Sequence, residues 1–136
     1  MREIKFRAKR IDNGEMIEGY YGIKGQGTDL EKHFIMISEL QINTTLPFFY
    51  FNDIEVIPES VGQFTGLTDK NGKEIYEGDI LLTSGKLKSA IVFYEAGFYL
   101  ECHRYNGDLW YMPLNYGMLQ NKEIIGNIYE NPELIK

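Results

Sequence analysis

The feature that most constrains the fold of this chain is a series of turn signals that divide it into short stretches of alternating polar and apolar residues. Alternation of period two places successive side chains on opposite faces of a strand. Stretches with helical periodicity are scarce, so the sequence predicts an all-β fold with minor helical turns. The clearest turn signals are Asp12-Asn13-Gly14, Asp69-Lys70-Asn71-Gly72, Ala96-Gly97 and Asn106-Gly107-Asp108.

The first half of the chain is predicted to form a β-hairpin and sheet region over residues 1–60. Ile4, Phe6 and Ala8 alternate with charged residues, so we expect these three side chains to face the interior. Residues 22–32 are rich in glycine near their start and are expected to form a loop. Further strands are expected at 15–21, 33–37, 48–51 and 54–57.

Residues 61–136 repeat this pattern with clearer turns and predict a small SH3-like β-roll or barrel, packed with the N-terminal region. The boundary between the two regions is soft, and together they are expected to form one compact unit. Short helical turns are expected within 113–120 and from Pro132, because proline favours the first position of a helical turn. Strands are expected at 80–83, 88–95, 98–103, 109–112 and 124–130.

Length and composition limit the classes of function. The 136 residues fit one domain or two small subdomains that share a core. No stretch approaches the roughly 18 consecutive apolar residues of a membrane span, and the N-terminus has no apolar signal core, so we expect a cytoplasmic protein without a membrane partner. Its single cysteine, Cys102, cannot form an internal disulfide or a four-cysteine metal site, and we expect no metal or cofactor.

The net charge of -6 disfavours sequence-independent binding to nucleic acid. Positive charge is nevertheless concentrated near the N-terminus, where Lys5, Arg7 and Lys9 alternate along a predicted strand. A strand face exposed to solvent explains this pattern, and an anion-binding patch is the alternative.

Three segments of unusual composition lie in order along the chain. The central segment consists of Gln63–Leu67 (QFTGL) and Asp69–Ile80 (DKNGKEIYEGDI), and the flanking segments are Lys5–Ala8 (KFRA) and Ile125–Pro132 (IGNIYENP). Together they resemble the recurrent blocks of the YopX-like proteins of phages and prophages, although Lys9 stands where that family often has an aromatic residue. The resemblance spans nearly the whole chain. It implies a phage or prophage origin in a bacterial host and a β-rich architecture with an SH3-like roll, and it implies no particular activity.

The carboxylates of Glu74, Glu77 and Asp79 cluster near a predicted turn, where paired acids can serve acid–base chemistry or bind a hard cation. A calcium loop beginning at Asp69 would need glycine at its sixth position, but glycine falls at the fourth. A structural role in turns and strand entry is therefore favoured for this cluster.

The segment Glu101-Cys102-His103 also suggests chemistry. In a strand, Glu101 and His103 share one face and Cys102 points to the other, so the cysteine and histidine do not meet locally. A catalytic pair of Cys102 with His33 stays open, and a buried, inert Cys102 is the favoured interpretation.

Aromatic residues are abundant in the predicted roll. Small β-barrels use such side chains to fill the core or to bind peptides and unstacked bases, and both interpretations stay open. The candidate binding surface combines the basic strand with five of these aromatics: Lys5, Arg7, Lys9, Tyr94, Tyr99, Tyr105, Trp110 and Tyr111.

Three functional hypotheses from different classes follow. The favoured one is a non-catalytic phage accessory module that binds an unidentified host or phage protein through sheet edges and exposed aromatics. The second is a single-stranded nucleic-acid-binding protein, in which the basic strand follows the phosphates and tyrosines stack on bases. The third is a small enzyme, although the sequence lacks a convergent nucleophile, base and orienting group. Open sheet edges also lead us to expect a homo-oligomer.

Overall fold

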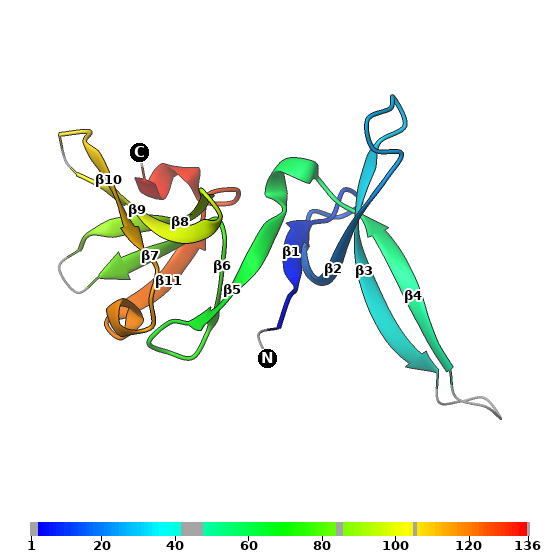
Figure 1. Cartoon of the computed structure of the whole chain (residues 1–136), viewed down its shortest axis with the longest axis horizontal. Helices are drawn as coiled ribbons and strands as arrows, with labels where there is room; N and C mark the ends of the chain where they lie inside the picture. Colours follow the sequence, from blue (N-terminus) through cyan, green and yellow to red (C-terminus); the bar gives the residue numbers. More distant parts are fainter. Residues whose placement is uncertain (1–2, 42–47, 84–85, 105, 136) are drawn as a thin grey trace. The chain divides into compact units, whose positions relative to one another are not determined.

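The computed structural model describes residues 3–41, 48–83, 86–104 and 106–135, with the backbone alone for 38–41 and 48–51. These residues form antiparallel strands joined by turns, and their helical segments are short 3-10 turns, which confirms the predicted all-β class (Figure 1). No helix among them is long and apolar enough to cross a membrane. The chain divides into an N-terminal unit, Glu3–Gln63, and a C-terminal unit that begins at Phe64. The expectation that regions 1–60 and 61–136 form one compact unit stays a prediction.

The N-terminal unit contains an antiparallel sheet in which sequential strands are neighbours. Strand β1 (Phe6–Lys9) pairs with β2 (Met16–Lys24), β2 pairs with β3 (Lys32–Gln41), and β3 pairs with β4 (Phe48–Glu55). The other side of β1 pairs with the first residues of β5 (Gly62–Thr68), which follows the 3-10 turn η1 (Pro58–Ser60). The prediction of two strands at 48–51 and 54–57 is wrong in one respect, because a single strand continues from Phe48 to Glu55.

The core of the N-terminal unit is small. Ala8, Ile35 and Val56 are buried, and Phe6 packs against them, which confirms the inward direction of Phe6 and Ala8. The same expectation is wrong for Ile4, which is 56% exposed, because strand pairing begins only at Phe6. The turn predicted at Asp12-Asn13-Gly14 is confirmed, with Gly14 at a positive φ of 74°. The predicted loop is shorter than 22–32, since β2 continues to Lys24 and β3 begins at Lys32.

The C-terminal unit contains the rest of β5, which pairs with β6 (Glu74–Tyr76), and an antiparallel sheet of five strands. The strand order of this sheet is β10-β9-β8-β7-β11, so β10 and β11 form its two edges (Figure 1). The described strands therefore form an open sheet and no closed barrel, and the likeness to an SH3 domain stays a prediction. The strands are β7 (Asp79–Thr83), β8 (Lys88–Tyr94), β9 (Gly97–His103), β10 (Leu109–Pro113) and β11 (Lys122–Asn127).

One face of the five-stranded sheet carries the larger core. Apolar side chains that alternate along the strands meet there, as period-two burial requires. Leu119 enters this core from the 3-10 turn η2 (Gly117–Leu119), within the segment where one or two helical turns were expected. The fully buried members of the core are Ile75, Leu81, Ile91, Leu100, Cys102 and Leu119.

The hairpin between β8 and β9 turns one residue earlier than predicted. Glu95 and Ala96 occupy the turn with positive φ values of 44° and 66°, and Gly97 already belongs to β9, opposite Tyr94. Two-residue hairpins match the twist of their strands when both turn residues have positive φ. The turn geometry therefore overrides the preference for glycine in the loop.

The last strand also ends earlier than the predicted 124–130. The side-chain oxygen of Asn127 accepts hydrogen bonds from the backbone amides of Tyr129 (3.0 Å) and Glu130 (2.9 Å), which turns the chain after β11. A 3-10 turn, η3 (Pro132–Ile135), follows with proline at its first position, as expected.

Candidate functional site

The acidic cluster of the central segment is built into the fold. Asp79 is 1% exposed, and its carboxylate accepts a hydrogen bond of 2.8 Å from the backbone amide of Tyr76. The Tyr76 hydroxyl in turn donates to Glu74 at 3.2 Å. Glu77 also takes part in interactions. Among the residues that the structure describes, no group of three or more acidic, histidine or cysteine side chains is placed to hold a metal ion.

Asp69 is a second buried carboxylate of this segment, 6% exposed. Its Oδ1 accepts hydrogen bonds from the amides of Asn71 and Lys73, both at 2.9 Å, and its Oδ2 accepts one of 3.0 Å from the amide of Ile124. Burial raises the pKa of the Asp69 carboxyl, but these three hydrogen bonds outweigh it and hold the pKa below the ordinary value of 3.8. A carboxylate saturated by backbone donors organises the turn and is poorly suited to acid–base chemistry.

Cys102 is 2% exposed, and its sulfur lies among apolar side chains with the Ser89 hydroxyl 3.4 Å away. Burial of the thiol is thus confirmed. Glu101 and His103 share the opposite face of β9, as expected from the alternation. His33 belongs to the N-terminal unit and is bonded there to other partners.

Those partners form a chain that sequence reasoning missed. The Tyr21 hydroxyl is hydrogen-bonded to Nδ1 of His33, Nε2 of His33 lies 2.9 Å from Glu31, and Glu31 accepts a bond of 2.8 Å from the amide of Gly27. A carboxylate, imidazole and hydroxyl in series resemble a nucleophile with its base, in which the base takes up the proton of the hydroxyl. Burial and the charge of Glu31 instead raise the pKa of Tyr21. This hydrogen-bonded series therefore has a structural role, in which it holds the β2–β3 loop against the sheet.

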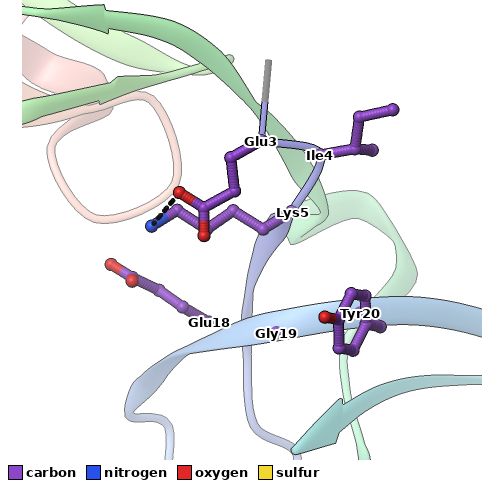
Figure 2. Close-up of a pocket in the computed structure, with 6 residues that line it drawn as sticks. All are labelled: Glu3, Ile4, Lys5, Glu18, Gly19 and Tyr20. Carbon is purple, nitrogen blue, oxygen red and sulfur yellow. Dashed lines mark ion pairs between the residues drawn. The ribbon is translucent and has the colours of Figure 1, made fainter. Parts of the chain in front are cut away.

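The basic strand lies in the N-terminal unit, where its charges have acidic neighbours. Lys5 lies 3.7 Å from Glu3, and Arg7 stands opposite Glu18 across the β1–β2 pair. Figure 2 shows Glu3, Lys5 and Glu18 around a pocket of about 250 Å³, with the Glu18 carboxylate directed toward the Lys5 amine. Lys9 is partly buried, and its backbone amide donates to Ser60. Two carboxylates at this pocket oppose the binding of an anion.

The tyrosines of the C-terminal unit come together on the face of the β8–β9–β10 sheet that is opposite its core. Tyr94 of β8 crosses β9 and stacks on Tyr111 of β10, with ring centroids 6.0 Å apart and an interplanar angle of 21°. Tyr99 meets Tyr94 edge to face at 6.2 Å. Tyr94 and Tyr111 remain 56% and 48% exposed. We call this surface the tyrosine face, and it comprises Tyr94, Tyr99, Tyr111 and the neighbouring Leu109.

A carboxylate lies within the tyrosine face. Oε2 of Glu101 accepts a hydrogen bond of 2.9 Å from the Tyr111 hydroxyl, and its Oε1 lies 3.0 Å from Nε2 of His103. The hydrogen bond and the negative charge of Glu101 both raise the pKa of Tyr111 above 10.0. Sequence reasoning placed Glu101 and His103 together but missed Tyr111, because that contact depends on the pairing of β9 with β10.

Trp110, another aromatic of the candidate surface, is not part of the tyrosine face. Trp110 alternates with Tyr111, so its ring is on the core side of the sheet, where Arg104 lies 4.4 Å from the ring centroid. Tyr105 lies outside the described residues.

The fold and the site define an all-β protein of two antiparallel units with an exposed cluster of tyrosines. The chain matches the family model described as YopX protein over residues 5–136 and therefore belongs to that family. It is also similar to the crystal structure of protein EF1440 from Enterococcus faecalis, with 25% sequence identity, a TM-score of 0.64 and full coverage of both chains. No curated protein matches it.

Proposed function

We propose that this protein is a non-catalytic interaction module of phages and prophages, which acts in the cytoplasm of the bacterial host and binds a host or phage protein through the tyrosine face. The observation that carries the proposal is the exposure of Tyr94 and Tyr111, about half of each residue, although the two rings stack on each other. Tyrosine supplies large contact area at low cost in conformational entropy, which is why it is enriched at protein interfaces.

Exposed apolar residues lie on both faces at the β8–β9–β10 end of the sheet. Exposed aromatic and aliphatic side chains gathered on neighbouring strands are typical of interaction surfaces. Since Tyr111 and Glu101 are already hydrogen-bonded to each other, a partner that covers them leaves neither polar group unpaired. The exposed large side chains on the tyrosine face are Tyr94, Leu109 and Tyr111, whereas Phe93 and Met112 are exposed on the core side.

A second candidate function is binding of single-stranded nucleic acid, which the stacked tyrosine rings favour because bases stack on such platforms. The position of Glu101 among the rings and the net charge of -6 both oppose a phosphate backbone. We therefore rank this function second. A small enzyme ranks third, because the raised pKa of Tyr21 disfavours proton loss from the hydroxyl of the Tyr21–His33–Glu31 series.

The test is a tagged pull-down from phage-bearing host cells, with and without nuclease, using the natural chain and three variants. We expect a stoichiometric protein partner that survives nuclease, is lost with Tyr94→Ala and Tyr111→Ala, and is retained with Tyr116→Ala. Tyr116 is 65% exposed and lies outside the tyrosine face, so its variant is a matched control. Recovery of nucleic acid that high salt releases would support the second candidate and contradict the first.

We also propose that the protein is a homo-oligomer, since the open sheet of the N-terminal unit ends at β4, whose outer edge a second copy can cover. Multi-angle light scattering at concentrations across the micromolar range measures this directly. A monomer at every concentration would contradict the proposal.

A further inference from the structure

The two edges of the five-stranded sheet differ in whether another segment is hydrogen-bonded to them. The outer side of β11 is occupied by the turn at Asp69, because the amide of Lys70 donates to the carbonyl of Lys122 and the amide of Ile124 donates to Asp69, both at 3.0 Å. No described residue covers the outer side of β10 in this way. An uncovered edge strand offers unpaired backbone groups to another chain.

The pairing of β9 with β10 identifies the residues of that edge. A backbone hydrogen bond of 3.0 Å lies at each end of the β9–β10 ladder, from the amide of Arg104 to the carbonyl of Asp108 and from the amide of Leu114 to the carbonyl of Phe98. Hydrogen-bonded pairs alternate with non-hydrogen-bonded pairs in an antiparallel ladder. Between these two bonds, Trp110 and Met112 are therefore the β10 residues whose backbone groups bond to β9. The amides and carbonyls of Leu109 and Tyr111 therefore point outward, with the two-residue spacing that an added strand requires.

The side chains beside this edge favour a basic residue in the added strand. A residue paired with Tyr111 would place its side chain on the tyrosine face, about 5.5 Å from Tyr111 between Cα atoms. There it would meet the stacked rings of Tyr94 and Tyr111, whose faces attract cations, and the carboxylate of Glu101. The chain itself makes the same kind of contact elsewhere, with Arg104 over Trp110 and Lys24 over Phe34.

We propose that the outer edge of β10 binds an extended peptide as an added strand, and that the peptide residue opposite Tyr111 is lysine or arginine. This inference rests on the proposed function and names its partner as an extended basic segment of a protein. Pro113 has no amide to donate, so the register that uses Leu109 and Tyr111 is the one with the most hydrogen bonds.

The experiment uses the full chain to select binders from a surface-displayed library of random eight-residue peptides. We expect the selected peptides to contain lysine or arginine among β-branched residues, and to protect the amides of Leu109 and Tyr111 from hydrogen exchange. The affinity of one selected peptide is then measured by fluorescence polarisation for the natural chain and for variants.

Leu109→Pro is the decisive variant because it removes an outward amide and leaves the β9–β10 ladder intact. Its matched control, Leu109→Ala, removes the side chain but keeps the amide. We expect Leu109→Pro to bind the peptide about tenfold more weakly than Leu109→Ala, as for roughly one lost backbone hydrogen bond. We expect Glu101→Gln to reduce both the affinity for the peptide and the dependence of that affinity on salt.

Equal affinity of the two Leu109 variants, unprotected amides, selected peptides without basic residues, or no selected peptide would each overturn the inference. So would a dimer of the natural chain that Leu109→Pro alone converts to monomer, because the edge would then bind a second copy. Failure of the proposed function is distinguishable, since the pull-down tests it with Tyr94→Ala and Tyr111→Ala and does not require a basic peptide.

Discussion

The Oδ2 atom of Asp69 accepts a hydrogen bond from the backbone amide of Ile124, and this contact joins the turn after β5 to the strand β11 at the end of the same unit. The carboxylate is buried and binds three backbone amides in all. Asparagine at position 69 can keep one acceptor oxygen. Its NH2 group replaces the other oxygen and would face a backbone amide, so that two donors oppose each other. We expect Asp69→Asn to lower the free energy of unfolding by about 1–3 kcal/mol, measured by urea denaturation at pH 7.

Glu123→Gln is the control for that substitution. Glu123 lies 3.8 Å from Lys70 with both side chains substantially exposed, and a surface ion pair of this kind contributes little. We expect its stability to stay within about 0.5 kcal/mol of the natural chain. Equal losses of stability in the two variants would show that the buried hydrogen bonds of Asp69 contribute no more than the exposed ion pair of Glu123.

The lowered pKa of Asp69 also predicts how stability depends on pH. Because the folded-state pKa lies below the unfolded value of about 3.8, the contribution of Asp69 is fully present above that value and is lost as pH falls through the folded-state pKa. The stability difference between the natural chain and Asp69→Asn should therefore shrink as pH falls below about 3.8. Denaturation curves at several pH values measure it, and a constant difference would contradict the assignment.

Both the backbone conformation at position 78 and the nearby ring of Tyr129 require glycine there. Its φ is +92°, and a Cβ there would lie 2.9 Å from the Tyr129 ring, whereas Gly72 has a φ of +81° and open space around it. Gly72→Ala isolates the backbone cost of about 1–2 kcal/mol. Gly78→Ala should cost roughly 1–3 kcal/mol more in thermal or urea unfolding, owing to overpacking. Similar losses for both variants would indicate that the Tyr129 ring moves aside freely.

Glu101 controls the ionisation of Tyr111. Because a hydrogen bond and negative charge from Glu101 raise the tyrosine pKa, Glu101→Gln should lower it toward 10.0. Titration of the ¹³Cζ NMR signal, assigned with Tyr111→Phe, measures this pKa. Glu123→Gln, which changes an acid outside the tyrosine face, should leave it unchanged.

The β8–β9 turn holds two residues in a conformation that asparagine and glycine adopt more readily. Replacing Glu95 and Ala96 by Asn-Gly should raise the free energy of unfolding by about 1 kcal/mol, because both positions have positive φ. The exposed substitution Glu133→Asn serves as a control with no expected change. No gain in the hairpin variant would mean that the present residues carry no strain there.

Local signals predicted much of this fold from the sequence. The period-two pattern and the turn residues located most strands, and the hairpin at Asp12-Asn13-Gly14 was found because its turn chemistry is strong. The tyrosines were predicted as candidates, but β10 is apolar at consecutive positions, so alternation could not tell whether Trp110 or Tyr111 faces the core.

Contacts between residues far apart in the sequence could not be predicted in the same way. The bonds of Asp69 to Ile124 and of Tyr111 to Glu101 depend on strand order and register, which a single sequence specifies only through the sum of many weak preferences. The stacking of Tyr94 on Tyr111 depends further on the early turn, which places Gly97, with no side chain, opposite Tyr94.

The buried thiol of Cys102 has a practical consequence for experiments on this protein. It is the one cysteine of the sequence, and at 2% exposure it is shielded from alkylating reagents. A cysteine introduced at an exposed position such as Glu95 would then react selectively with a fluorophore or a crosslinker. Site-specific labelling beside the tyrosine face therefore does not require a cysteine-free background.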